Sequence, residues 1–271
     1  MKTVLITGSA GNLAREIIKE LKGKYFTIGL DMLPSKTDIS QEVVLSDYNI
    51  EELLQTYDPD IIIHLAGTSR PVDCQKDVLS AMDNNFKITD QIIRYCNKTD
   101  VHLIYPSSIH VFSDSTEEYI ESSHLDPINS YGLTKALSEK YIIRNLKKYT
   151  ILRLDGVIGE ESRLIKDTVI RGLNGISSEM YVNTIRSFLR EDDLAKTVEF
   201  IIKNNKYGIY NLRGPESKTM YEWGINIADK YGFDKDLIVA THSRNIHDVK
   251  RIILNIDKAK EELMFEPKSI L

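Results

Sequence analysis

The chain has 271 residues, of which 42% are hydrophobic and 28% charged, a composition typical of an ordinary globular protein. Its formal net charge of -5, without a long basic run, excludes a general nucleic-acid binder, and no apolar stretch reaches the roughly 18 residues of a membrane span. Cys74 and Cys96 are too few and too far apart to predict a disulfide framework or a metal site. Since the N-terminus lacks a signal-peptide pattern, we expect a cytoplasmic protein without nucleic-acid or membrane partners.

In the first half, short apolar runs alternate with helical patterns. The predicted strands cover residues 3–7, 25–30, 42–45, 61–65, 102–105 and 149–154. The predicted helices cover residues 13–21, 50–56, 79–96 and 133–146. This alternation indicates parallel strands joined by right-handed crossovers, so the sequence predicts an α/β fold with a Rossmann-type doubly wound parallel sheet.

After about residue 159 the pattern changes. Helices are predicted over residues 164–173, 191–203, 220–231 and 257–263, with one short strand over 208–212. We expect a first domain over residues 1–160 and a small α/β lobe over residues 161–271, packed at the carboxyl edge of the sheet. Without a flexible linker between them, the two parts are expected to share one cleft.

A glycine-rich turn follows the first predicted strand, where residues 7–14 read Thr-Gly-Ser-Ala-Gly-Asn-Leu-Ala. Gly8 and Gly11 permit a tight turn and the close approach of a pyrophosphate to the helix start at Asn12 and Leu13. Asp31 stands 20 residues beyond Gly11, at the end of the second strand. A carboxylate there accepts hydrogen bonds from the adenosine ribose and repels a 2′-phosphate. The first domain is therefore expected to bind NAD rather than NADP.

A tyrosine and a lysine stand four residues apart at Tyr131 and Lys135. On a helix this spacing places both side chains on one face. An ammonium beside a phenol favours the phenolate and lowers the tyrosine pKa from about 10, so Tyr131 would exchange a proton near neutral pH. The pair is a candidate acid/base, although the spacing alone also fits an exposed pair on a helix surface.

With Gly8, Gly11, Asp31, Tyr131 and Lys135 in this order, the chain resembles the extended short-chain dehydrogenase/reductase family of NAD-dependent epimerases, dehydratases and sugar reductases. The further cofactor-binding positions that this resemblance implies are Asp47 and Tyr48 at the adenine, Leu65, Ala66 and Gly67 in a small-residue turn, and Asn85.

The resemblance also implies the chemistry, a hydride transfer between NAD and a carbinol or ketone carbon. Tyr131 would exchange the hydroxyl proton, and Lys135 would lower the pKa of Tyr131 and bind the nicotinamide ribose. Ser108, in a Ser-Ser-Ile-His stretch, would hydrogen-bond the reacting oxygen. No metal is expected. Relatives often dimerise through the helices predicted here over 79–96 and 133–146, so a homodimer is expected.

The substrate-binding residues implied by the resemblance are Ser108, His110, Arg186 and Arg244. Arg186 opens a stretch similar to the family's Arg-x-Phe-x-x-x-Asp-Asp-Val-Ala, in which the arginine reaches a substrate phosphate. His110 is open to two interpretations, a substrate contact or a structural role at a strand end. Arg244 only partly meets the family's Arg-x-Gly-Asp element.

Departures from the family pattern narrow the reaction. Ile109 and His110 replace the Asp-Glu pair of the 4,6-dehydratases, which argues against water elimination, and Gly156 stands where the epimerases have an asparagine. The first interpretation is a nucleotide-sugar epimerase or 4-keto reductase, favoured by Arg186. The second is a dehydrogenase of a free sugar acid, similar to uronate dehydrogenases and favoured by Gly156 and the short chain. The third is a non-catalytic NAD-binding regulatory or scaffold protein, against which the intact catalytic set argues.

Overall fold

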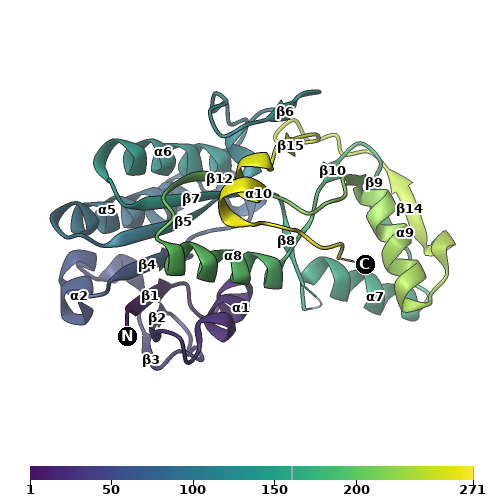
Figure 1. The fold of residues 1–271 in the computed structure, drawn as a ribbon. Helices are drawn as coiled ribbons and strands as arrows, with labels where there is room; N and C mark the ends of the chain where they lie inside the picture. Colours follow the sequence, from purple (N-terminus) through teal and green to yellow (C-terminus); the bar gives the residue numbers. More distant parts are fainter. Residues whose placement is uncertain (160, 271) are drawn as a thin grey trace.

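A parallel sheet of seven strands forms the centre of the molecule (Figure 1). The computed structural model describes residues 1–159 and 161–270; Glu160, where the expected first domain ends, and Leu271 lie outside the described residues. The strand order is β12-β7-β5-β4-β1-β2-β3, and every neighbouring pair is parallel. The strands are β1 (Thr3–Thr7), β2 (Phe26–Asp31), β3 (Ile39–Glu42), β4 (Ile61–His64), β5 (His102–Ser108), β7 (Tyr149–Leu154) and β12 (Gly208–Leu212). The predicted Rossmann-type sheet is confirmed.

Helices cover both faces of this sheet (Figure 1). One face carries α1 (Asn12–Leu21), α8 (Glu191–Asn204) and α10 (Asp257–Leu263), and the other carries α2 (Ile50–Tyr57), α5 (Ile88–Lys98) and α6 (Ser130–Asn145). Because successive strand residues point to opposite faces, Val4 and Ile6 enter the core under α1 and α8, whereas Leu5 enters the core under α2 and α5. In the part of the chain that is described, no helix combines the length and the apolar character that crossing a bilayer requires.

The second half of the chain completes this sheet. β12 pairs with β7 from Gly208 opposite Thr150 to Leu212 opposite Leu154, and α8 packs against α1. The expected domain boundary at residue 160 therefore does not coincide with the edge of the sheet. What remains of the second half forms the smaller lobe.

This smaller lobe is built from two helices and short paired strands (Figure 1). Its elements are α7 (Arg163–Leu173), α9 (Met220–Tyr231), β8 (Val157–Ile158), β9 (Ser178–Tyr181), β10 (Ile185–Arg186), β11 (Leu189–Arg190), β13 (Lys218–Thr219), β14 (Ile238–Thr241) and the 3-10 helix η4 (Lys235–Leu237). Trp223 of α9 is buried against Phe188 and donates its Nε1–H to the carbonyl oxygen of Arg186 at 2.9 Å. This packing fixes α9 against the strand that carries Arg186.

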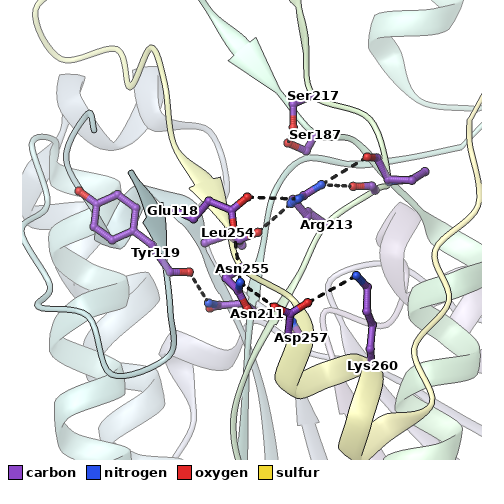
Figure 2. A network of polar contacts seen from close by, with 12 residues as sticks. Glu118, Tyr119, Ser187, Asn211, Arg213, Ser217, Leu254, Asn255, Asp257 and Lys260 are labelled. Atoms are coloured by element: carbon purple, nitrogen blue, oxygen red, sulfur yellow. Dashed lines mark hydrogen bonds and ion pairs between the residues drawn. The ribbon is translucent and has the colours of Figure 1, made fainter. Parts of the chain in front are cut away.

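A polar network joins the C-terminal segment to the end of β12 (Figure 2). Arg213, directly after β12, donates from Nε to the carbonyl oxygen of Leu254 at 2.7 Å and lies 3.8 Å from a carboxylate oxygen of Glu118. Asn211 donates from Nδ2 to the carbonyl oxygen of Tyr119 at 2.9 Å. Strands β6 (Glu118–Tyr119) and β15 (Ile253–Leu254) pair in parallel beside these contacts. The segment after β5 is thereby tied to the C-terminal part of the chain.

Two predicted elements differ from the structure. The strand predicted over 42–45 is displaced, because the chain turns into the 3-10 helix η1 (Leu45–Asp47) and the pairing strand β3 ends at Glu42. The helix predicted over 79–96 consists of α4 (Val78–Ala81), the π-helix η2 (Met82–Lys87) and α5. Apolar spacing predicts the helical course but not the π-turn, which places one extra residue in the turn around Asn85. The preceding helix α3 (Pro71–Lys76) was not predicted.

Candidate active site

One cleft of about 1160 Å³ runs along the carboxyl ends of the sheet strands and is closed on its far side by the smaller lobe. The predicted site residues that line it are Gly8, Gly11, Asn12, Leu13, Asp31, Leu65, Ala66, Gly67, Ser108, His110, Tyr131, Lys135 and Arg186. The predicted site residues that do not line it are Asp47, Tyr48, Asn85 and Arg244. The fold therefore brings residues from both halves of the chain to one site.

The glycine-rich turn is shaped by its contact with the loop after β4. Gly8 has a φ of +69°, and its N–H donates to the carbonyl oxygen of Leu30 at 2.8 Å. A Cβ at Gly8 would lie 2.7 Å from the backbone nitrogen of Ala66, so only glycine fits here. Gly11 is the N-cap of α1, which leaves the first N–H groups of this helix directed at the cleft. The turn has the form that accepts a phosphate group.

Asp31 ends β2 beside this turn. Its two carboxylate oxygens accept the N–H groups of Ala10 at 3.0 Å and of Leu33 at 3.1 Å, so the side chain is held in one orientation. Each oxygen keeps a second lone pair for a hydroxyl donor. Asp47 and Tyr48, predicted to hold an adenine, are exposed outside the lining, and the nearby cleft wall is formed instead by residues 43–46.

Asn85 lies behind the cleft wall. Its Oδ1 accepts the N–H of Thr68 at 2.7 Å, and its Nδ2 donates to the hydroxyl of Thr134 on α6 at 3.0 Å. A Cβ at Gly67, where φ is +141°, would lie 2.6 Å from Asn85 Oδ1. Asn85 therefore positions the small-residue turn against α6 and does not itself line the cleft.

The start of α6 places the tyrosine and lysine in the cleft. Asn129 caps this helix by accepting the N–H of Gly132 at 2.8 Å, so Tyr131 lies in the first turn and Lys135 in the second. Lys135 donates from Nζ to the carbonyl oxygen of Pro106 at 3.0 Å, and Nζ lies 6.0 Å from the ring centre of Tyr131. Ser108, at the end of β5, lines the same wall. The three predicted catalytic residues therefore lie together.

Burial governs the protonation of this group. It raises the pKa of Tyr131 to about 12, while the hydrogen-bonding side chain of Ser108 acts in the opposite direction. Burial also lowers the pKa of Lys135 to about 8, against the attraction of the carboxylate of Glu139. The expectation that Lys135 lowers the pKa of Tyr131 toward neutrality is wrong for this arrangement. At neutral pH Tyr131 is a protonated phenol.

His110 lies between the helix cap and Tyr131. Its Nδ1 accepts from Asn129 Nδ2 at 3.0 Å, and its ring meets that of Tyr131 edge to face at 5.6 Å. Burial, together with the positive charge of Arg186, lowers the pKa of His110 to about 3. The imidazole is therefore neutral and carries its proton on Nε2. His110 has both a structural contact and a place in the cleft wall.

The two predicted substrate arginines lie in different places. Arg186 lines the cleft, and its two terminal nitrogens donate to the carbonyl oxygens of Ile185 at 2.7 Å and Val249 at 2.8 Å. Arg244 is exposed on the loop after β14, outside the cleft lining. The two side chains therefore do not form a joint phosphate clamp.

Gly156 has a steric explanation. Its φ is +37°, and a Cβ there would lie 2.6 Å from the ring of Phe188, which lines the cleft. Phe188 thus fills the space that a side chain at position 156 would take. The absence of an asparagine at this position follows from this packing and needs no particular substrate.

Asp155, Thr184 and Phe188 are among the lining residues that were not predicted. Asp155 directly follows β7, the strand next to the one that carries Ser108. A polar residue at the carboxyl end of a parallel strand is the signal that could have identified it. Thr184 and Phe188 come from the smaller lobe, where no comparable signal exists.

Comparison with known proteins finds similarity to a sugar-nucleotide reductase and to a subunit of methionine adenosyltransferase. A family model described as the RmlD substrate binding domain matches residues 1–267. The dTDP-4-dehydrorhamnose reductase of Aggregatibacter actinomycetemcomitans is 27% identical over 244 residues, covering 85% of this chain and 79% of that protein. The methionine adenosyltransferase 2 subunit beta of Mus musculus is 26% identical over 264 residues, covering 91% of this chain and 76% of that protein.

Solved structures of similar fold carry nucleotide cofactors. MoeE5 in complex with UDP-glucose and NAD superposes with a TM-score of 0.88 at 19% identity, covering 98% of this chain and 94% of that one. The dTDP-4-dehydrorhamnose reductase of Bacillus anthracis in complex with NADP has a TM-score of 0.86 at 21% identity, covering 96% and 91% of the two chains. At these identities the likeness establishes the fold.

Proposed function

The chain belongs to the family of the RmlD substrate binding domain, and from this membership we propose that it is an NAD-dependent oxidoreductase or epimerase acting on a nucleotide-linked sugar. The observation that carries the proposal is the meeting of Ser108, Tyr131 and Lys135 in a cleft whose other end holds Gly8 and Asp31. The relatives that are sugar-nucleotide reductases support the same substrate class.

The residues present fit a dinucleotide. The turn at Gly8 excludes a Cβ, the helix start after Gly11 offers free N–H groups, and the fixed carboxylate of Asp31 suits two ribose hydroxyls. Asp31 would repel a 2′-phosphate, which favours NAD over the NADP bound by one structural neighbour. When bound, the nicotinamide supplies or accepts the hydride. Lys135, at the other end of the cleft from Asp31, would bind the nicotinamide ribose.

The chain's own residues would handle the proton. Ser108 Oγ accepts the N–H of His110 at 3.3 Å, and the hydroxyl of Ser108, which also hydrogen-bonds Tyr131, would bond the reacting oxygen. Tyr131, protonated at neutral pH, would give its proton to the oxygen of a ketone as it is reduced and regain one afterwards. Burial of both groups excludes competing water. The residues are thus poised for the reduction direction.

Two measurements on the purified protein test the proposal. A thermal-shift screen of dTDP- and UDP-linked sugars with NAD or NADH present identifies ligands, because binding to the folded state raises its stability. Turnover then separates the reactions: NADH consumption with a keto sugar indicates a reductase, and product formation without net absorbance change indicates an epimerase. NADH formation with a free uronic acid, and no binding of nucleotide sugars, would replace this proposal with the sugar-acid dehydrogenase.

A second function has one specific observation in its favour, the likeness to methionine adenosyltransferase 2 subunit beta over 91% of the chain. Such a role would make the chain a non-catalytic subunit that binds a nucleotide without turning it over. Retained NAD binding with no turnover on any ligand from the screen would favour this reading over the first.

We also propose that the protein forms a homodimer through the helices α5 and α6. Leu133 and Tyr141 of α6 are exposed apolar residues on the helix pair by which relatives often dimerise. A monomer mass by light scattering at micromolar concentration would refute it.

A further inference from the structure

The lining of the cleft includes polar side-chain oxygens without partners. Among the described residues, three of the side chains with a buried, unpartnered oxygen line this cleft: Asp155 at Oδ1, Ser162 at Oγ and Thr184 at Oγ1. A buried polar atom without a hydrogen bond is costly, so native proteins usually give it a partner, a water or a ligand. Three such atoms among the residues that line one cleft indicate that the cleft is built to meet a polar ligand.

Asp155 is the charged member of this group and lies next to the reaction site. In the sheet, Ser108 of β5 is opposite Leu154 of β7, and Asp155 is the next residue. Neighbouring strands are about 4.8 Å apart, so Asp155 stands beside Ser108 at the carboxyl edge. A sugar held at Ser108 would therefore lie near the end of β7 that carries Asp155.

Among the described residues, only one of the two carboxylate oxygens of Asp155 has a hydrogen-bond partner. Oδ2 accepts the N–H of Ser187 at 2.6 Å and so holds the strand connection that carries Arg186. Oδ1 has no partner among the described residues. The structural contact explains why an acceptor stands at position 155, but not why a carboxylate with a second oxygen is buried there.

Charge also limits what this end of the cleft accepts. The side chain of Asp155 is 0% exposed, and burial raises its pKa, while the positive charges of Arg186 and Arg213 lower it. Arg186 already donates to two backbone carbonyls, so part of its hydrogen-bonding capacity is taken up. With Asp155 ionised beside these arginines, a substrate carboxylate at Oδ1 would bring a second set of acceptor oxygens without a donor, whereas a hydroxyl or ammonium would find an acceptor.

We propose that Asp155, with the hydroxyl of Thr184, binds a hydroxyl or ammonium group next to the reacting carbon and rejects a sugar that carries a carboxylate there. The inference rests on the proposed function, since it specifies the sugar of the same nucleotide-sugar site. It makes Asp155 a specificity-determining residue for neutral or amino sugars and disfavours uronic acids as substrates.

The test is isothermal titration of matched ligands into the full-length protein with saturating NAD. The probes are UDP-glucose against UDP-glucuronic acid, and dTDP-glucose against dTDP-glucuronic acid. The variant Asp155→Asn keeps an acceptor for Ser187 but replaces the free oxygen by an amide donor. The matched control is Asp193→Asn, which changes a buried carboxylate that binds the N–H of Lys268 outside the cleft.

The wild type should bind the neutral sugar about tenfold or more tighter than the acid. Asp155→Asn should reduce this ratio about tenfold or more, and Asp193→Asn should leave it unchanged. If Asp155→Asn weakens both ligands equally or neither, the inference is overturned while the proposed function stands. If no probe binds the wild type although NAD does, both are overturned.

A second variant covers the case in which Asp155→Asn does not fold, as judged by circular dichroism and NAD binding. Thr184→Val keeps the side-chain shape and removes only the hydroxyl. It should weaken binding of the neutral sugar severalfold. Unchanged affinity would overturn the inference by itself.

Discussion

Buried histidines should make the protein sensitive to acid. His64 of β4 bonds the hydroxyls of Thr7 at 2.7 Å and Thr89 at 2.9 Å, and His102 of β5 bonds that of Thr150 at 2.8 Å. Burial lowers the pKa of His64 to about 3 and that of His102 to about 4. Both imidazoles therefore stay neutral in the folded protein at pH values at which an unfolded chain binds a proton.

The sign and size of the effect follow from this difference. An unfolded histidine has a pKa near 6.5. Below that pH the unfolded state binds more protons than the folded state, so the free energy of unfolding decreases as the pH is lowered. Between about pH 7 and about pH 5 each of these histidines removes about 2 kcal/mol, and His110, whose pKa is also lowered to about 3, removes a similar amount, so the three together remove about 6 kcal/mol. Asp155 and Glu191, whose pKa values burial raises, act in the opposite direction and reduce the sum. This loss is large compared with the free energy of unfolding of a typical folded domain, which is roughly 5–15 kcal/mol.

Urea unfolding at the two pH values measures the effect. His102→Gln, which cannot gain a proton, should lose about a third of the pH-dependent difference, about 2 kcal/mol. The control is His242→Asn, at an exposed position, which should keep the wild-type difference. If His102→Gln and the wild type lose the same free energy between the two pH values, the assignment of acid sensitivity to buried neutral histidines is refuted.

Three further variants test other parts of the structure. Tyr131→Phe should lower turnover at least about 100-fold, while NAD binding measured by fluorescence stays intact; near wild-type rates would exclude Tyr131 as the acid. Glu139→Gln leaves Arg153, which is 2% exposed, without its carboxylate partner, and should lower the free energy of unfolding in urea by about 3–5 kcal/mol. The double variant Glu139→Met with Arg153→Met leaves no buried charge unpaired and should cost much less. Asp31→Ala removes the carboxylate that repels a 2′-phosphate, so it should lower the ratio of the NADPH dissociation constant to the NADH dissociation constant about tenfold or more. An unchanged ratio would count against the binding of the ribose by Asp31.

The sheet and the cofactor end of the cleft were predictable from the sequence because their signals are local. A buried parallel strand reads as an apolar run, and the turn at Gly8 and the carboxylate at Asp31 follow from their positions at strand ends. The spacing of Tyr131 and Lys135 likewise predicts that both side chains face one way. Such features depend on a few neighbouring residues, so the rest of the fold changes little about them.

Other properties depend on contacts that the sequence does not reveal. The pKa of Tyr131 is set by burial from several elements, so a pairwise argument from Lys135 predicted the wrong direction. Arg244 matches a motif but lies on an exposed loop, since its position depends on how β14 connects to the C-terminal segment. Asp155 acquires its significance only when β7 is placed beside β5.

The alignment of the catalytic residues depends on side chains outside the cleft. Lys135 and Glu139 are one turn apart on α6, and they bind successive residues of β5: Lys135 donates to the carbonyl of Pro106, and Glu139 accepts from the hydroxyl of Ser107. Arg153 of β7 holds the carboxylate of Glu139 through two nitrogens. Since Ser108 is the next residue of β5, this buried ion pair holds the end of β5 that carries Ser108 against α6. A change that loosens the pair should therefore reduce stability and catalytic alignment together.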